Sequence, residues 1–295
     1  MKIYLENVNL QSTNGPNSFA NKLIPPMIRL GHEFVSPVNA EINLCFIESP
    51  TKANNVPRIQ RLDGIYYNTR FNYNQQNANI KRTYEESQGV IYQSEYGKKL
   101  ITKFFGEHNN GIVIYNGADV KAIEASAAMK NDVEGRHIWS CAASWRPHKR
   151  LGENIRYFLE HKGEKDILIV AGETPKLVED KSIYYMGNLT QTQLYSLYKG
   201  SSYFLHLGWL DCCPNVVVDA RACGSKIICT TSGGTQEVAG PEAIVIEEEE
   251  WNFEPLDLYD PPKLNFQKKL DNLYNVGYNI DMVAQEYAKF MGSFL

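Results

Sequence analysis

Two spacings of hydrophobic residues alternate along this chain and predict its elements. Short runs of β-branched and aromatic residues fit buried parallel strands. Between these runs, apolar residues recur three or four positions apart, as they do along one face of a helix. In the first part of the chain, the predicted strands are 2–6, 42–47, 58–62, 89–93 and 112–115, and the predicted helices are about 18–30, 77–86 and 95–105.

The same alternation continues to the C-terminus. Residues 121–135 have no clear period and are interpreted as a linker. Strands that alternate with helices on both sides of this linker indicate two α/β units with parallel sheets, residues 1–120 and 121–280. After the linker, the predicted strands are 137–142, 166–171, 182–186, 202–206, 226–230 and 243–246, and the predicted helices are 150–160, 190–199, 215–223, 263–275 and 280–290.

The first predicted helix contains a pair of prolines. Phe19, Leu23 and Met27 have helical spacing, but Pro25-Pro26 interrupts the pattern. Proline removes a helical hydrogen bond and its ring crowds the preceding turn. A break or kink is therefore expected at this pair, and Gly31 is expected to close the segment.

The stretch 211–237 reads as a turn, a helix, a strand and a second helix start. Pro214 suits the first position of a helix, where its missing N–H would be unpaired. Residues 215–223 then form the helix, and Gly224 ends it as a left-handed cap. The run 226–230 fits a buried strand, and 232–235 is a tight turn that opens the second helix. Two helix N-termini at neighbouring strand ends predict a phosphate site.

Two carboxylates accompany the first of these helices. Asp211 precedes it and Asp219 lies inside it, so they can reach different parts of one extended ligand. Carboxylates are good acceptors for sugar hydroxyls. A diphosphate site with such acceptors predicts a nucleotide sugar as the ligand.

This stretch resembles the donor-site signature of family-4 glycosyltransferases, which are retaining enzymes of the GT-B fold. That signature has two glutamates seven residues apart, often with Cys-Pro-Asn between them, and then Ala-x-Ala-Cys-Gly and Gly-Gly-x-x-Glu. The matching residues here are Asp211, Cys213-Pro214-Asn215, Asp219, 220–224 and 233–237. Both acids are aspartates, one methylene shorter than glutamate. The resemblance implies two Rossmann-like α/β domains that face each other across a cleft, with a last helix, 281–295, that crosses back to the first domain.

The resemblance also implies a set of donor-binding residues. The family has an arginine and a lysine after the first strand of its second domain. Lys149 matches the lysine, Ser144 stands at the arginine position, and Arg146 is expected to substitute from the same loop. The alternatives are a solvated basic loop here and helix capping for Ser232 and Thr235. The implied donor-binding residues are Gly15, Pro16, Arg146, Lys149, Asp211, Pro214, Asn215, Asp219, Gly233, Gly234 and Thr235.

Retaining transfer in this family needs no protein nucleophile. The protein stabilises charge that grows on the leaving diphosphate, which is the role expected for Lys149, with Asp211 beside it. Asp63 is either an acid–base group on the acceptor side or an aspartate that caps a turn before glycine. His148 and His206 are interpreted as histidines that are hydrogen-bonded within the protein and have no catalytic role. Neither a metal nor a cofactor is implied beyond a UDP- or GDP-sugar donor.

Composition narrows the class of protein. The net charge is −4, and residues 1–120 hold 12 Lys and Arg against 10 Asp and Glu, so a dedicated nucleic-acid binder is not expected. No apolar run approaches the roughly 20 residues of a membrane span. The six cysteines lack zinc-type spacing and are interpreted as reduced core residues of a cytoplasmic protein.

The function predicted is transfer of a hexose, with retention and without a metal, from a nucleotide sugar to an alcohol group of a glycan. A lipid acceptor at a membrane stays open. Two alternatives remain. One is a catalytically silent protein that binds nucleotide sugars or carbohydrates on the same fold. The other is a GT-B epimerase that acts on the donor itself.

Overall fold

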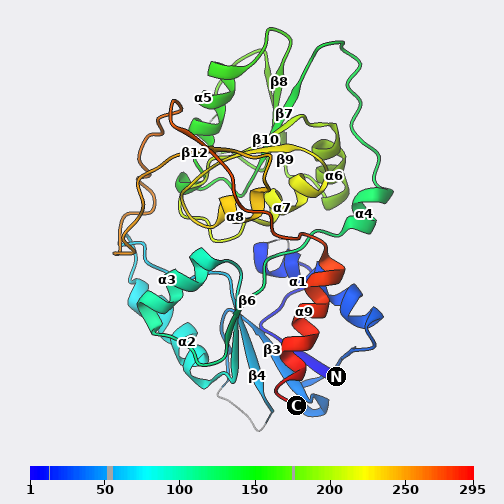
Figure 1. Ribbon diagram of the computed structural model, residues 1–295, viewed down its shortest axis with the longest axis vertical. Helices are drawn as coiled ribbons and strands as arrows, with labels where there is room; N and C mark the ends of the chain where they lie inside the picture. The colour runs from blue at the N-terminus through cyan, green and yellow to red at the C-terminus, as the bar shows by residue number, and fades with distance from the viewer. Residues whose placement is uncertain (13, 52–55, 175–176) are drawn as a thin grey trace. The chain divides into compact units, whose positions relative to one another are not determined.

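The computed structural model describes residues 1–12, 14–51, 56–174 and 177–295. The chain forms two compact units (Figure 1). The first consists of residues 1–118, 252–256 and 277–295, and the second of residues 119–251 and 257–276. The segment 252–256 thus belongs to the first unit although it lies inside the range expected for the second.

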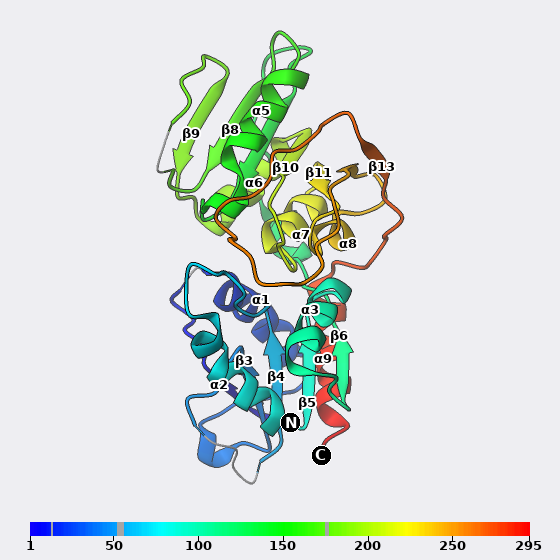
Figure 2. The same ribbon diagram turned by 90° about the vertical axis from the view of Figure 1, so that its left-hand side faces the viewer.

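The first unit is built on a parallel sheet, which within the described residues has the strand order β2-β1-β3-β4-β5-β6. Its apolar core lies on both faces of this sheet. Residues of α1 and α9 pack on one face, and residues of α2 and α3 on the other (Figure 2). The elements are β1 (Lys2–Glu6), α1 (Gly15–Arg29), β2 (Glu33–Phe34), the 3-10 turn η1 (Pro37–Asn39), β3 (Ile42–Phe46), β4 (Arg58–Leu62), α2 (Tyr73–Glu86), β5 (Gly89–Tyr92), α3 (Glu95–Phe105), β6 (Gly111–Val113) and α9 (Ile280–Gly292).

Helix α1 is continuous across its proline pair, so the break that was expected as one outcome there does not occur. The helix starts at Gly15, earlier than predicted, because the side chain of Asn14 caps it by accepting the N–H of Asn17 at 3.1 Å. It then runs through Pro25 and Pro26 to Arg29. The apolar stripe of α1, headed by the fully buried Phe19, packs into the core. This burial offsets the lost hydrogen bonds.

The second unit contains a sheet in the order β13-β12-β11-β10-β7-β8-β9, as far as its described residues show. Every pairing is parallel except that of β13 with β12, which is antiparallel. The elements are α4 (Val120–Ala125), β7 (Ile138–Ala142), η2 (Pro147–Lys149), α5 (Leu151–His161), β8 (Ile167–Ala171), β9 (Ile183–Gly187), α6 (Gln191–Gly200), β10 (Tyr203–His206), α7 (Asn215–Ala222), β11 (Lys226–Thr230), α8 (Thr235–Ala239), β12 (Ile244–Ile246) and β13 (Lys269–Asp271).

One prediction for this unit is wrong. The segment 263–275 is not a helix: it is irregular, turns at 266–267 and contributes the short strand β13. Leu264 and Phe266 enter the core, whereas Leu270 is 47% exposed and Leu273 92% exposed. These apolar positions therefore do not form the continuous buried stripe of an amphipathic helix. At the start of the segment interpreted as a linker, 121–135, lies the short helix α4.

Helix α9 completes the core of the first unit. Ile280, Ala284, Tyr287 and Met291 are buried in the same cluster as residues of α1.

In the described part of the chain no helix is both long and apolar enough to cross a membrane. The six cysteines are free thiols.

Candidate functional site

The strand order of the second unit creates a position for a ligand at the carboxyl ends of its strands. From β7 the chain proceeds outward through β8 and β9, and then returns to place β10 on the other side of β7. The connections after β7 and β10 therefore diverge at the carboxyl ends of two adjacent strands. This is the topological switch point at which open α/β sheets bind ligands. The loop after β7 carries Lys149, and the loop after β10 carries Asp211.

The carboxylate of Asp211 joins the two loops. Lys149 Nζ forms an ion pair with Asp211 Oδ2, and the Nε2 of His206, at the end of β10, lies 3.0 Å from the same oxygen. The His206 side chain is buried, whereas the side chains of Lys149 and Asp211 are 20% and 15% exposed. No hydrogen bond from the described residues reaches Asp211 Oδ1, so this oxygen can accept a ligand hydroxyl.

The charges of this cluster depend on one another. Burial by itself raises the pKa of Asp211, but the nearby Lys149 ammonium and the bond from His206 outweigh it and bring that pKa well below its usual range. Burial lowers the pKa of His206, against the opposing effect of Asp211. His206 is thus a neutral imidazole that donates through Nε2. Burial and the charge of Lys149 lower the pKa of His148 to about 4, so that ring is neutral as well.

The cations of the loop after β7 differ in their partners. Arg146 is exposed, and its side chain makes no hydrogen bond or ion pair within the part of the chain that the structure describes. Arg150 is buried, and its guanidinium binds the carboxylate of Glu248 at 2.8 Å. The charges available to an anionic ligand are therefore Arg146 and Lys149.

Helix α7 begins at Asn215, as predicted, but Pro214 is its N-cap and not its first helical residue. Pro214 has extended backbone angles and is the N-cap, and Asn215 is the first helical residue. Proline at the N-cap still leaves the first N–H groups of the helix without intrahelical partners. Gly224 follows the helix with a φ of +91°, as predicted. Asp219 is only 3% exposed, and Gln191 at the start of α6 donates to its Oδ2 at 3.2 Å.

The glycine turn before α8 supports the Asp211 loop. Gly234 N–H donates to the carbonyl of Asp211 at 2.8 Å, and Leu210 N–H donates to Ser232 Oγ at 3.0 Å. Gly233 has a φ of +77°, and a Cβ there would lie 2.7 Å from the amide nitrogen of Asp211. Only glycine fits this position.

Thr235 does not cap α8. It is the first residue of the helix, and its buried Oγ1 has no hydrogen-bond partner among the described residues. The hydroxyl of Ser232 is used by Leu210. Neither side chain therefore makes the capping contact that was the alternative reading for this turn.

The remaining predicted site residues lie in the first unit. Gly15 and Pro16 are the first two residues of α1, next to its Asn14 cap. Asp63 follows β4, and its carboxylate is paired with Arg61. The second unit brings together Lys149, Asp211, Gly233 and Gly234.

From the sequence, His206 was interpreted as a histidine hydrogen-bonded within the protein, and its contact with Asp211 was not predicted. Its imidazole holds the carboxylate on the side opposite to solvent. The available signal was its place as the last residue of a buried strand, five positions before Asp211.

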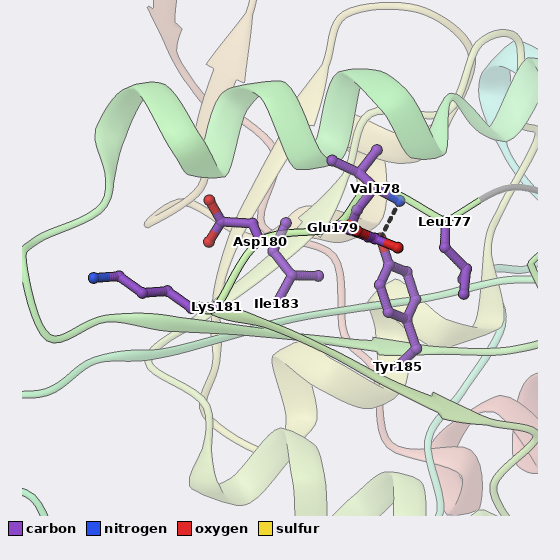
Figure 3. Close-up of a pocket in the computed structure, with 7 residues that line it drawn as sticks. All are labelled: Leu177, Val178, Glu179, Asp180, Lys181, Ile183 and Tyr185. Atoms are coloured by element: carbon purple, nitrogen blue, oxygen red, sulfur yellow. Dashed lines mark hydrogen bonds between the residues drawn. The ribbon is translucent and has the colours of Figure 1, made fainter.

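Two hollows of the surface lie away from these residues. One of about 500 Å³ is lined by residues 177–181, Ile183 and Tyr185, and Val178 N–H donates to the Tyr185 hydroxyl there (Figure 3). A second, of about 540 Å³, lies in the first unit beside His108 and Phe294. None of the predicted site residues lines either one. Within the described residues, no cluster of His, Cys, Asp and Glu could hold a metal ion.

Comparisons with known proteins place the fold. No protein-family model matches the chain, and no curated protein does. Among solved structures, HepE from Anabaena in complex with UDP and glucose is 12% identical, with 99% of this chain and 100% of that chain covered and a TM-score of 0.70. Sucrose-phosphate synthase from Thermosynechococcus elongatus is 10% identical, with 84% and 86% covered and a TM-score of 0.65.

A third solved structure agrees with these two. AviGT4, a glycosyltransferase of avilamycin A biosynthesis, is 12% identical, with 99% of this chain and 97% of that chain covered and a TM-score of 0.63. All three are GT-B glycosyltransferases. The chain therefore has the GT-B fold, and the predicted fold class is confirmed.

Proposed function

We propose that this protein is a glycosyltransferase whose donor is a nucleotide-diphosphate sugar. The observation that carries the proposal is the cluster of Lys149, Asp211 and His206 at the switch point of the second sheet, beside the starts of α7 and α8. An ammonium beside the positive ends of two helices is a suitable environment for a diphosphate. The similarity to HepE, described in complex with UDP-glucose, supports the same donor class.

Each group of the cluster has a defined task in this proposal. Lys149, with Arg146 on the same loop, neutralises charge that develops on the leaving diphosphate. Asp211 Oδ2 holds Lys149 and leaves Oδ1 for a hydroxyl of the sugar. His206 fixes the carboxylate from behind. Asp219 accepts a second hydroxyl group of the donor.

The finer features follow from the resemblance of the sequence. The sugar is a hexose, its configuration is retained, no metal takes part, and the acceptor is an alcohol group of a glycan. Asp63 acts on the acceptor side by accepting a hydrogen bond from the attacking hydroxyl. Gly15 and Pro16 contact the donor from the first unit.

Thermal shift with UDP-glucose, GDP-glucose and ADP-glucose tests the donor class, since a ligand that binds the native state raises its melting temperature. We expect one of the three to raise the Tm of the wild-type protein. Asp219→Ala should abolish the shift. Lys149→Ala should weaken binding about tenfold to hundredfold, because a hydrogen bond to a charged group contributes about 1.5–3 kcal/mol.

Lys81→Ala is the matched control for these variants. Lys81 lies on α2 and pairs with Glu85 at the surface, so its loss should leave donor binding unchanged. Full shifts in both Asp219→Ala and Lys149→Ala would place the site elsewhere. A donor that binds without any release of UDP or GDP would favour the silent binding protein instead.

A further inference from the structure

Arg61 is a wholly buried charge in the core of the first unit. It lies near the end of β4, with a relative exposure of 0%. Its guanidinium stacks over the ring of Phe19 on α1, 4.1 Å from the centroid. Ile59, two positions earlier, belongs to the same core cluster as α1 and α9. An apolar residue would satisfy this face of the strand, and a buried charge is costly unless it is paired and hydrogen-bonded.

The guanidinium is bound by three side chains from separate parts of the chain: Tyr287, Asn116 and Asp63. Its Nε donates to the hydroxyl of Tyr287 on α9 at 3.0 Å. Its Nη2 donates to Asn116 Oδ1, after β6, at 2.8 Å. Its Nη1 pairs with Asp63 Oδ1, directly after β4. The planar guanidinium holds these acceptors in fixed directions, whereas an ammonium is a compact point charge whose donors rotate.

Asp63, Asn116 and Gln93 lie at the carboxyl ends of neighbouring strands of the first sheet. Asp63 follows β4, and Asn116 follows β6 and donates to Gln93, which follows β5, at 3.3 Å. The carboxyl ends of neighbouring parallel strands are where α/β sheets bind ligands. Asp63 is the member of this network that reaches the surface, with 20% of its side chain exposed, while Arg61 lies beneath it.

We propose that Arg61 is a positioning residue that orients the carboxylate of Asp63 toward the acceptor hydroxyl. Tyr287 fixes Arg61 in turn, so the C-terminal helix contributes to the acceptor side of the reaction. The inference rests on the proposed function, because it concerns the acceptor role of Asp63. Arg61 itself touches no reacting atom.

The test is the release of UDP from UDP-glucose by the chain of residues 1–295, with water as the acceptor. Arg61→Met and Asp63→Asn should each lower kcat about tenfold to hundredfold and leave the KM for UDP-glucose within about twofold. Tyr287→Phe should lower kcat less, because it removes one of the hydrogen bonds that hold Arg61 and leaves those to Asn116 and Asp63. If Arg61 acts through Asp63, the double variant Arg61→Met/Asp63→Asn should be no slower than Asp63→Asn alone.

Two variants separate positioning from folding. Tyr84→Phe removes a buried hydroxyl of the same unit that binds the carbonyl of Gly106 at 2.9 Å, and its kcat should be unchanged. Arg61→Lys keeps the charge but loses the fork, so it decides the question if Arg61→Met does not fold. We expect a lower kcat with an unchanged KM. Wild-type kcat in Arg61→Lys, or independent losses in the double variant, would overturn the proposal.

A second readout does not depend on turnover. In ¹³C NMR of labelled aspartate carboxyl groups, the titration midpoint of Asp63 should move to higher pH in Arg61→Met, because the loss of a neighbouring positive charge disfavours the ionised form. Tyr84→Phe should leave the midpoint in place. If the wild-type protein releases no UDP, the assay is repeated with GDP-glucose and ADP-glucose, and the proposed function fails if none of the three donors is cleaved. An unmoved midpoint would overturn the role of Arg61 by itself.

Discussion

At the scale of single residues, Asp211 is the group on which the candidate site depends. Its carboxylate meets an ammonium and an imidazole at one oxygen and leaves the other available. The two aspartates are shorter than the glutamates of the resembling family, and Asp211 uses its limited reach to bind the Lys149 ammonium and the His206 imidazole. Asp211 therefore also holds the side chains of Lys149 and His206 in position.

The lowered pKa of Asp211 has a consequence for stability. A carboxyl group whose pKa is lower in the folded than in the unfolded state stabilises the fold above its unfolded pKa, about 3.9, and loses that contribution as the pH falls. Asp211→Asn should therefore lower the Tm at pH 7, and its difference from the wild-type protein should shrink below about pH 4. Thermal melts from pH 7 to pH 3 measure both quantities.

Asp132→Asn serves as the control for this experiment. Asp132 is exposed in the segment before β7, so its variant should follow the wild-type curve. A constant difference in Tm between Asp211→Asn and the wild-type protein over the whole range would contradict the linkage.

At the scale of elements, the turn between β11 and α8 is hydrogen-bonded to the loop before α7 and holds its backbone in place. The Gly234 amide and the Ser232 hydroxyl bind the backbone of that loop. Gly233 makes the close approach possible, because any Cβ there would meet the backbone of Asp211. The two helix starts are held in register by backbone contacts that ligand binding does not have to create.

Gly233→Ala should disturb this support strongly. The added Cβ meets the Asp211 backbone at a φ of +77°, so we expect a loss of several kcal/mol in the free energy of unfolding and loss of UDP-glucose binding. Gly224→Ala is the matched control, since Gly224 has a φ of +91° but nothing within 4 Å of the added atom. Its cost should be the backbone strain alone, about 1–3 kcal/mol. Urea unfolding and calorimetry distinguish the two, and equal effects would contradict the role of the close approach.

At the scale of the whole molecule, the end of the chain completes a core that its beginning starts. Helix α9 packs against α1 (Figure 1), and its buried face joins the cluster formed by β1, β3 and β4. The segment 252–256 also returns to the first unit, where Leu256 exchanges backbone hydrogen bonds with Tyr67 and Thr69. The first unit is thus assembled from three separate parts of the sequence.

Removal of residues 277–295 should unfold the first unit. The truncation takes away the buried side chains of Ile280, Ala284, Tyr287 and Met291, and each large buried side chain is worth about 2–5 kcal/mol, so the loss exceeds the stability of a typical domain. Calorimetry should show one unfolding transition fewer, with rapid proteolysis of residues 1–118. Met282→Ala, at a position on α9 that is 61% exposed, should leave both observations unchanged. An intact first unit in the truncated chain would contradict this account.

The sequence by itself determined the local architecture. The ranges of β1, β4, α3 and β11 follow directly from hydrophobic spacing and end signals, since strands and helices of this kind depend on neighbours in the chain. The donor-site motif was readable for the same reason, because its turn, helix and strand lie within one short stretch. The GT-B fold followed from that motif and from the alternation of strands with helices.

Only the tertiary structure decided how distant residues meet. Core burial carries α1 through its proline pair and holds Leu264 and Phe266 in a segment without helix, which local spacing could not reveal. Arg61 binds Tyr287 far along the chain, and Asp211 binds Lys149 from another loop. Such contacts depend on which strands the sheets place side by side. Hydrophobic spacing predicts which face of a helix or strand is buried, but it does not predict which other element packs against that face.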